Sequence, residues 1–159
     1  MAGSVMVGSA VVDDLPELVA VQHAGALAGL SHIFPQDRYP FPRDAVLARW
    51  ATELADGETE VFVSTDEVGV ITGFAAIRGD ELLHFGTAVN TWATGLAADL
   101  HDALLTRFHP TVTRARLRVY TANARARRFY EKLRWTATGA VSRSTFPPHA
   151  ELLQYAREL

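Results

Sequence analysis

The chain contains no cysteine. This excludes disulfide bonds, a thiolate nucleophile and a thiolate metal site, so any chemistry must use oxygen or nitrogen side chains, and we expect no metal cofactor. The sequence also lacks an apolar run long enough to span a bilayer, and its first residues lack the basic stretch before an apolar one that marks a signal peptide. We therefore expect a cytoplasmic, soluble protein with no membrane partner.

The composition predicts one compact domain, residues 1–159. A chain of 159 residues with 48% hydrophobic content and no internal repeat is large enough to bury a sizeable core. Its net charge of -3 is unevenly distributed, because residues 107–134 hold eight Arg and one Lys against one Glu, a net +8, and the rest is acidic. One region of the protein is therefore suited to an anion, whereas the acidic remainder argues against polyanion binding.

The hydrophobic pattern predicts the order strand, two helices, three strands, helix, strand, helix and two strands. The expected strands cover 5–10, 60–65, 70–78, 81–89, 116–120, 136–145 and 151–157, and the expected helices begin near 14, 44, 95 and 123. Between the first two helices, residues 29–42 combine three prolines with aromatic side chains. Prolines prevent regular structure while aromatics favour burial, so an ordered loop is expected there.

The segment Trp92-Ala93-Thr94-Gly95-Leu96-Ala97 directly precedes a helix-forming run from Ala98 to Leu105. Small residues at a helix N-terminus let an anion approach unpaired backbone N–H groups and the positive end of the helix dipole. The segment resembles the pyrophosphate loop of the GNAT superfamily of acyl-CoA-dependent N-acyltransferases, whose pattern is Gln/Arg-x-x-Gly-x-Gly/Ala. Trp92 stands where that family more often has Gln or Arg, which removes one side-chain contact from the loop.

A more specific resemblance follows, from Asn123 to Trp135. The sequence Asn-Ala-Arg-Ala-Arg-Arg-Phe-Tyr-Glu-Lys-Leu-Arg-Trp is similar to the family's block Asn-x-x-Ala-x-x-Phe-Tyr-Glu-Lys-x-Gly-Phe/Trp. Asn123 suits a helix N-cap, and apolar residues recur after it at helical spacing. Arg134 replaces the Gly that usually closes this helix, at an expected stability cost of ~1 kcal/mol.

The resemblance covers nearly the whole chain and implies the mixed α/β fold of the family. That fold has a mostly antiparallel central sheet of about seven strands, four helices and a splay between the fourth and fifth strands, where acetyl-CoA binds as co-substrate. The pantetheine would pair with the backbone of Phe85, Gly86 and Thr87. Phosphates would lie on the amides of Trp92, Ala93, Thr94, Gly95, Leu96, Ala97 and Ala98, with further cofactor contacts from Asn123, Arg125, Arg127 and Arg128.

The resemblance also implies catalytic residues. An amine must be neutral to attack a thioester, so a base has to take its proton, directly or through water. Glu81 matches the position from which several branches of the family supply a carboxylate. Side chains alternate along a strand, which puts Glu81 and Phe85 on one face and His84 on the other. This alternation favours Glu81 over His84 as the general base unless a bulge intervenes. Tyr130 matches the tyrosine that protonates the departing thiolate.

We therefore expect an N-acetyltransferase that transfers an acetyl group to a primary amine of a small molecule or peptide by direct attack in a ternary complex. The acceptor should be selected in part by residues 29–42, where Phe34, Tyr39 and Phe41 either line the pocket or fill the core. Dimerisation through the C-terminal strands is a further expectation.

Two other interpretations remain open from the sequence. Glu81 beside Asp80 is also typical of a turn carboxylate, and a GNAT domain can bind acyl-CoA without turnover, as a sensor or scaffold. Alternatively, the arginines of 114–128 form a nucleic-acid-binding face, since Arg114, Arg116 and Arg118 alternate along a strand. The acidic remainder and the lack of any RNA-binding or helix-turn-helix signature argue against this last interpretation.

Overall fold

The computed structural model describes residues 5–159, so the first four residues of the predicted domain lie outside it. The order of helices and strands is the one predicted. In chain order they are β1 (Met6–Ser9), α1 (Leu15–Gly29), α2 (Arg43–Ala55), β2 (Thr59–Thr65), β3 (Ile71–Arg78), β4 (Glu81–Thr87), α3 (Leu96–Leu105), β5 (Arg114–Tyr120), α4 (Ala124–Lys132), β6 (Thr136–Arg143) and β7 (Glu151–Glu158). Within residues 5–159, no helix has both the length and the apolar character that a bilayer crossing requires.

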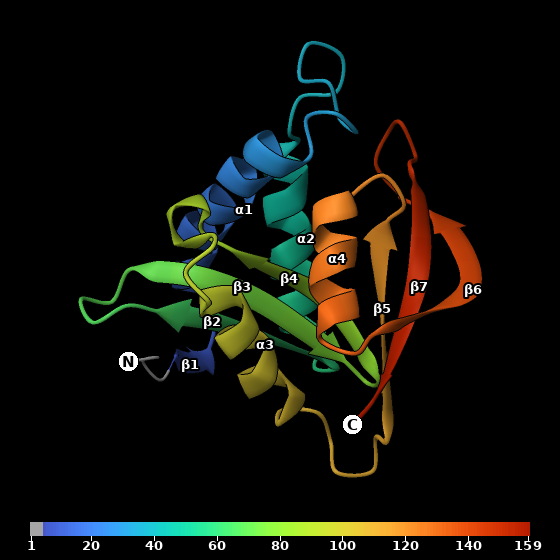
Figure 1. Cartoon of the computed structure of the whole chain (residues 1–159). Helices are drawn as coiled ribbons and strands as arrows, with labels where there is room; N and C mark the ends of the chain where they lie inside the picture. The colour runs from blue at the N-terminus through green and yellow to red at the C-terminus, as the bar shows by residue number, and fades with distance from the viewer. Residues whose placement is uncertain (1–4) are drawn as a thin grey trace.

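The seven strands form one sheet in the order β1-β2-β3-β4-β5-β7-β6. All neighbouring strands are antiparallel except β4 and β5, which run parallel. β4 and β5 separate after the pair Glu81 and Arg116, the one residue pair that they share within the described chain. The mixed sheet of seven strands, the four helices and the predicted splay between the fourth and fifth strands are thus confirmed (Figure 1).

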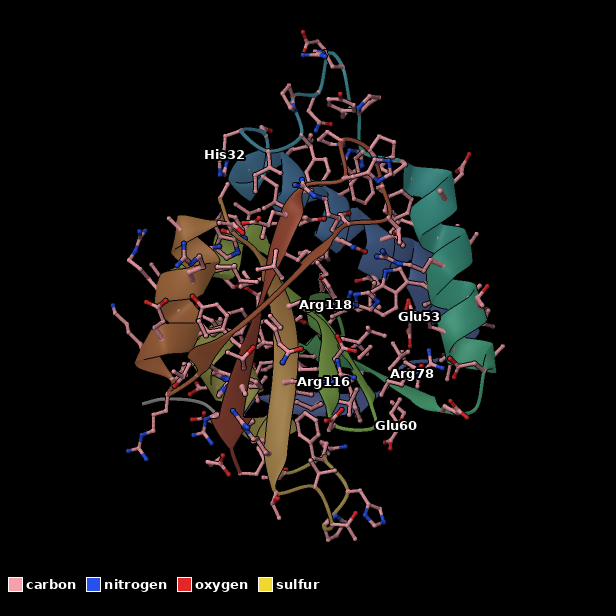
Figure 2. The ribbon with its side chains drawn as sticks, turned by 90° about the vertical axis from the view of Figure 1, so that its right-hand side faces the viewer. His32, Glu53, Glu60, Arg78, Arg116 and Arg118 are labelled. Carbon is pink, nitrogen blue, oxygen red and sulfur yellow. The ribbon has the colours of Figure 1, made fainter. Side chains whose placement is uncertain are left out.

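The helices cover both faces of the sheet. Figure 2 shows α2 on one side of the strands and α4 on the other. Because side chains alternate along each strand, the sheet contributes to two separate cores. One core, under α1 and α2, is centred on Leu18, Trp50 and Phe74. The other, under α3 and α4, includes Leu100, Leu104, Leu117, Tyr130, Trp135 and Tyr155.

The segment between α1 and α2 is an ordered loop, as predicted. Gln36 organises it, since its side-chain amide donates to the carbonyl oxygens of Phe34 at 2.7 Å and Tyr39 at 3.4 Å. Its side-chain oxygen accepts a hydrogen bond from the amide of Phe41 at 3.0 Å. These bonds hold the loop aromatics at the end of the sheet where β4 and β5 separate.

Arg134 occupies a left-handed backbone conformation, with φ of 75°, directly after α4. A side chain with a Cβ is strained there by ~1–2 kcal/mol, and glycine is not, although glycine also gains entropy in the unfolded chain. We expect Arg134→Gly to raise the free energy of unfolding by ~0.5–1 kcal/mol, measured by urea denaturation. Arg134→Ala retains the Cβ and should change it by less than ~0.5 kcal/mol. An equal gain from both variants would mean that the arginine side chain, not the backbone, is responsible.

Candidate active site

A cavity of about 920 Å³ follows the splay between β4 and β5. Its wall comes from both strands, from α1, α2 and α4, and from the α1–α2, β4–α3 and β6–β7 loops. Phe85, Gly86 and Thr87, the predicted pantetheine partners, all line it. β4 pairs with β3 on its other edge through these residues, and β5 has already diverged from them. The free backbone edge of β4 is therefore available to an extended ligand, which can bind as an added strand.

The β4–α3 loop closes one end of the cavity with small residues. Gly95, the N-cap of α3, has a φ of 92°, and Ala93 has a φ of 63°. Glycine takes such a conformation without strain, which explains why it stands at this turn. The amide of Leu96 donates to the hydroxyl of Thr94 at 3.3 Å, whereas those of Ala97 and Ala98 make no hydrogen bond within residues 5–159. Two backbone N–H groups thus remain available for an anion.

Of the predicted loop contacts, Trp92, Ala93 and Ala97 line the cavity, whereas Thr94, Gly95, Leu96 and Ala98 do not. The Trp92 ring lies against α1, where a Cβ at Gly29 would be 3.4 Å from it. The guanidinium carbon of Arg125, in the first turn of α4, lies 3.6 Å from the centre of the same ring. This cation–π contact joins the two sides of the cavity. An arginine from α4 thus lies at the loop position of Trp92, where the GNAT pattern more often has Gln or Arg.

The N-terminal half of α4 forms the opposite wall. The Asn123 side chain accepts a hydrogen bond from the amide of Ala126 at 3.2 Å, which confirms the predicted N-cap. Asn123, Arg125, Arg128 and Tyr130 line the cavity, but Arg127 does not. Arg127 instead donates to the hydroxyl of Tyr155 at 3.1 Å and to the carbonyl of Thr121 at 3.2 Å. Of the three predicted phosphate-binding arginines, this one is engaged in contacts within the fold.

Tyr130 is 8% exposed and packs among Phe85, Phe129 and Trp135, with ring centres 5.3–6.4 Å apart. Its hydroxyl makes no hydrogen bond within residues 5–159, and its side chain contributes to the cavity wall. Burial raises the pKa of this phenol well above its usual value. The group therefore stays protonated and is chemically a proton donor.

A β-bulge in β4 corrects the predicted arrangement of its side chains. His84 pairs with Ala76, and Leu82 pairs with Ile77, so Leu83 is an extra residue without a partner on β3. The extra residue reverses the alternation that follows it. As a result Phe85 packs on the face of α3 and α4, while His84 and Glu81 both lie on the face of α2. The expectation that Glu81 shares a face with Phe85 and not with His84 was wrong.

His84 and Glu53 form a close pair on this face. Both carboxylate oxygens of Glu53 lie 2.9 Å from Nε2 of His84, and Figure 2 shows Glu53 between α2 and the sheet. Because a carboxylate only accepts, Nε2 carries the hydrogen, and Nδ1 keeps a free lone pair when the ring is neutral. Desolvation by burial lowers the pKa of His84, although the hydrogen bond to Glu53 acts in the opposite direction. His84 lines the cavity, and its burial favours the neutral ring.

Glu81 is buried but does not line this cavity. Its carboxylate lies 3.1 Å from Nε of Arg118 and 3.5 Å from Nη1 of Arg116. It belongs to a separate depression near the β3–β4 turn, where carboxylates and arginines alternate. Glu81 therefore does not share a cavity with Tyr130 and the free edge of β4, whereas His84 does.

The loop aromatics lie at the other end of the cavity. Phe34, Tyr39 and Phe41 all contribute to its wall. Phe34 makes an edge contact with Tyr120 of β5, with ring centres 5.4 Å apart. Nε2 of His32 lies 2.9 Å from the carbonyl oxygen of Ala122, just before α4. The α1–α2 loop therefore bridges α1 and α4 over the splay, near the position of His32 in Figure 2.

Three residues near the cavity were not singled out by the sequence interpretation. Glu53 and Arg49 lie on one face of α2, one turn apart, and Phe146 lies in the β6–β7 loop with its ring centre 5.4 Å from the Arg49 guanidinium. The only local signal was the i,i+4 spacing of an arginine and a glutamate, which is equally typical of an exposed helix surface. Their shared location depends on how α2 packs against the sheet.

The predicted basic stripe on β5 is neutralised by carboxylates. Arg114 lies 3.5 Å from Glu158, and Arg118 is paired with Glu81. Arg116 bonds to Asp80 at 3.0 Å as well as to Glu81. Figure 2 shows Arg116 and Arg118 one below the other on this strand. A polyanion would have to displace these carboxylates, so the stripe is not a free basic face.

Solved structures with the same fold include several N-acetyltransferases. The ribosomal-protein-S18-alanine N-acetyltransferase of Escherichia coli is 20% identical, covers 97% of this chain and 93% of its own, and superposes with a TM-score of 0.71. Apo-form YjaB of Escherichia coli is 18% identical, with 96% of each chain covered and a TM-score of 0.75. Spermidine N-acetyltransferase of Vibrio cholerae, solved with CoA and spermine, is 13% identical, with coverage of 98% and 95% and a TM-score of 0.72.

The chain has no significant match among curated proteins. The structural similarities, all at low identity, establish the fold alone. A family model provides the assignment, since the acetyltransferase (GNAT) domain matches residues 19–146, most of the chain. With the splayed sheet and the glycine-containing loop before α3, this match shows that the protein is an acyltransferase that belongs to the GNAT family.

Proposed function

We propose that the protein transfers an acetyl group from acetyl-CoA to a primary amine of a small molecule or peptide, by direct attack in a ternary complex. The observation that carries this proposal is that a free strand edge, unpaired helix amides and a neutral histidine converge on one cavity. Acetyl-CoA supplies the activated acyl group as a thioester. The edge of β4 suits its amide-containing arm, and the amides of Ala97 and Ala98 suit its pyrophosphate.

The proton transfers are assigned to His84 and Tyr130. His84 takes the proton of the acceptor amine at Nδ1, directly or through water, while Glu53 holds the ring by its Nε2 hydrogen and favours the positive charge that develops. Tyr130 donates its phenolic proton to the sulfur of the departing thiolate. His84 lies on the α2 face and Tyr130 on the α4 face, so the amine and the thioester arrive from opposite sides of the sheet.

The direct test combines cofactor binding with turnover. Calorimetric titration should give one-to-one binding of acetyl-CoA, and weaker binding of dephospho-CoA. Turnover with an amine is then followed by the released CoA thiol with a thiol-specific dye, to which this cysteine-free chain contributes no background. Binding without thiol release in the presence of any amine would favour a non-catalytic, acyl-CoA-binding role. Absence of binding would refute the proposal.

Arg125 is expected to contribute to cofactor affinity in place of the missing loop side chain. Its guanidinium lies on Trp92, in the loop that leads into α3, and lines the same cavity as Ala97 in the first turn of that helix. Arg125→Ala should weaken acetyl-CoA binding by about tenfold, because a charge-assisted hydrogen bond contributes ~1.5–3 kcal/mol and part is lost to solvent screening. The measurement is the calorimetric Kd. Arg114→Ala, a change at an exposed arginine remote from the cavity, is the matched control and should leave Kd unchanged.

A further inference from the structure

Arg49 is a cation in the half of the cavity that the cofactor does not need. It lies on the α2 face, with its guanidinium over the Phe146 ring, on the same side of the sheet as His84. The residues suited to the cofactor phosphates, Trp92 and Arg125, lie at the junction of the β4–α3 loop and α4. Arg49 is thus located where the acceptor amine has to approach His84.

The guanidinium of Arg49 lacks hydrogen-bond partners in the fold. It makes no hydrogen bond within residues 5–159, and its buried Nε atom is unsatisfied. Arg49 forms an ion pair with Glu53, but its Nε lies 3.6 Å from the carboxylate oxygen, too far for a hydrogen bond, and both oxygens of that group also bond to His84. Desolvation by burial lowers the pKa of Arg49, although the charge of Glu53 acts in the opposite direction. A partly buried cation with unused donors is a site for an anion.

The other charged side chains of the cavity wall are also positive. No aspartate or glutamate of residues 5–159 contributes to it. Its formally charged side chains are those of Arg49, Arg118, Arg125, Arg128, Lys132 and Arg143. Arg118 is neutralised by Glu81, and Arg143 bonds to the carbonyl of His149 at 3.3 Å. A polyamine needs carboxylates around its second ammonium group, and this wall offers repulsion instead.

We infer that the acceptor is a small amine that also carries an oxyanion, in the simplest case a carboxylate, and that Arg49 binds this oxyanion while His84 faces the amine. The inference rests on the proposed function and specifies its substrate class. A guanidinium fork matches a carboxylate in geometry, and the unused donors of Arg49 can form charge-assisted hydrogen bonds with it. Amino-acid-like acceptors should therefore be preferred to their neutral amides and to polyamines.

The test is an acceptor panel at saturating acetyl-CoA, followed by thiol release. It contains the common L-amino acids, each beside its carboxamide, together with β-alanine, ethanolamine phosphate, ethanolamine and spermidine. Rates are expressed per neutral amine, because a carboxamide lowers the pKa of the neighbouring amine. We expect KM to be about 10- to 100-fold lower for a carboxylate than for its amide, with similar kcat. A preference for ethanolamine phosphate would support the Arg49 site and identify the oxyanion as a phosphate.

Variants link the preference to Arg49. Arg49→Gln should raise KM of the preferred acceptor about 10- to 100-fold and abolish discrimination against the amide, whereas Arg49→Lys should retain part of it. Arg43→Gln changes an arginine of the same helix outside the cavity wall and serves as the control, with thermal melting as the check of folding.

Other outcomes decide against the inference. Equal use of acids and amides, preference for spermidine, or a KM ratio that Arg49→Gln leaves unchanged would overturn it. It would also fail if the enzyme binds acetyl-CoA but acetylates no oxyanion-bearing amine. Failure to bind acetyl-CoA is a different result, because it would refute the proposed function itself.

Discussion

His84→Gln is expected to lower kcat by about 10²- to 10⁴-fold, the usual contribution of a positioned general base. Gln has nearly the size of His and can hydrogen-bond to Glu53, but it cannot accept the proton of the amine. Acetyl-CoA binding should be unchanged, since His84 lies on the α2 face, away from the amides of Ala97 and Ala98. Steady-state turnover and calorimetry together separate the two effects.

The pH dependence of kcat tests the role of His84 more specifically than the size of kcat does. His84 acts only when neutral, and its pKa is lowered by burial, so activity is retained above this lowered pKa and falls as the pH decreases through it. Glu53 raises the pKa of His84, so Glu53→Gln should shift this acidic limb to lower pH as well as reduce kcat. In His84→Gln the limb due to the imidazole should disappear. The remaining dependence is that of the amine itself.

Two comparisons test this assignment. His109→Gln alters an exposed histidine in the α3–β5 connection and should have no effect. Glu81→Gln removes the carboxylate that pairs with Arg116 and Arg118. Because the charge of Glu81 makes only the smallest contribution to raising the pKa of His84, this variant should keep the acidic limb and shift it to lower pH by less than Glu53→Gln does. If Glu81→Gln abolishes the acidic limb and His84→Gln does not, the base is Glu81 acting through water, contrary to the present assignment.

Tyr130→Phe is expected to lower kcat by about 10²-fold while the Kd for acetyl-CoA changes by less than about twofold. The substitution removes only the hydroxyl, and the ring keeps its contacts with Phe85, Phe129 and Trp135. The hydroxyl makes no hydrogen bond within residues 5–159, so its loss should cost little stability. Because burial raises the pKa of this phenol, no alkaline limb due to its ionisation is expected in the usual assay range.

Tyr155→Phe provides the matched contrast. The Tyr155 hydroxyl donates to Glu131 at 2.7 Å and accepts from Arg127 at 3.1 Å, on β7 and outside the cavity wall. Its removal should lower the free energy of unfolding by ~1–3 kcal/mol and leave kcat unchanged. Unchanged turnover in Tyr130→Phe would remove Tyr130 from the role of acid.

Short-range patterns predicted much of this protein. The order of strands and helices followed from hydrophobic periodicity and turn residues. In this chain the spacing of apolar residues within each strand or helix indicates which of its faces is buried. The Asn123 cap and the strained position of Arg134 after α4 were also predictable, since they depend on a few neighbouring residues. The same motifs identified the family that the domain match later established.

Side-chain direction was the part that local patterns could not supply. The bulge at Leu83 exists in the pairing of β4 with β3, and nothing in the residues of β4 marks it. A shift of one residue reverses every later side chain, so it decided that His84 and not Phe85 faces α2. Arg127 and Arg128 likewise differ by one position on α4, which rotates one toward β7 and the other toward the cavity.

The sequence by itself thus determined the order of strands and helices, because this order depends on periodicity and turn residues. Its two motifs indicated the fold and the acyltransferase family through their resemblance to GNAT proteins. Only the tertiary structure decided which groups meet in the cavity. Arg125 lies on Trp92, Glu53 holds His84, and Arg49 remains without a hydrogen-bond partner within residues 5–159. Each of these depends on how separate helices and strands pack against each other, and packing geometry has no local signature.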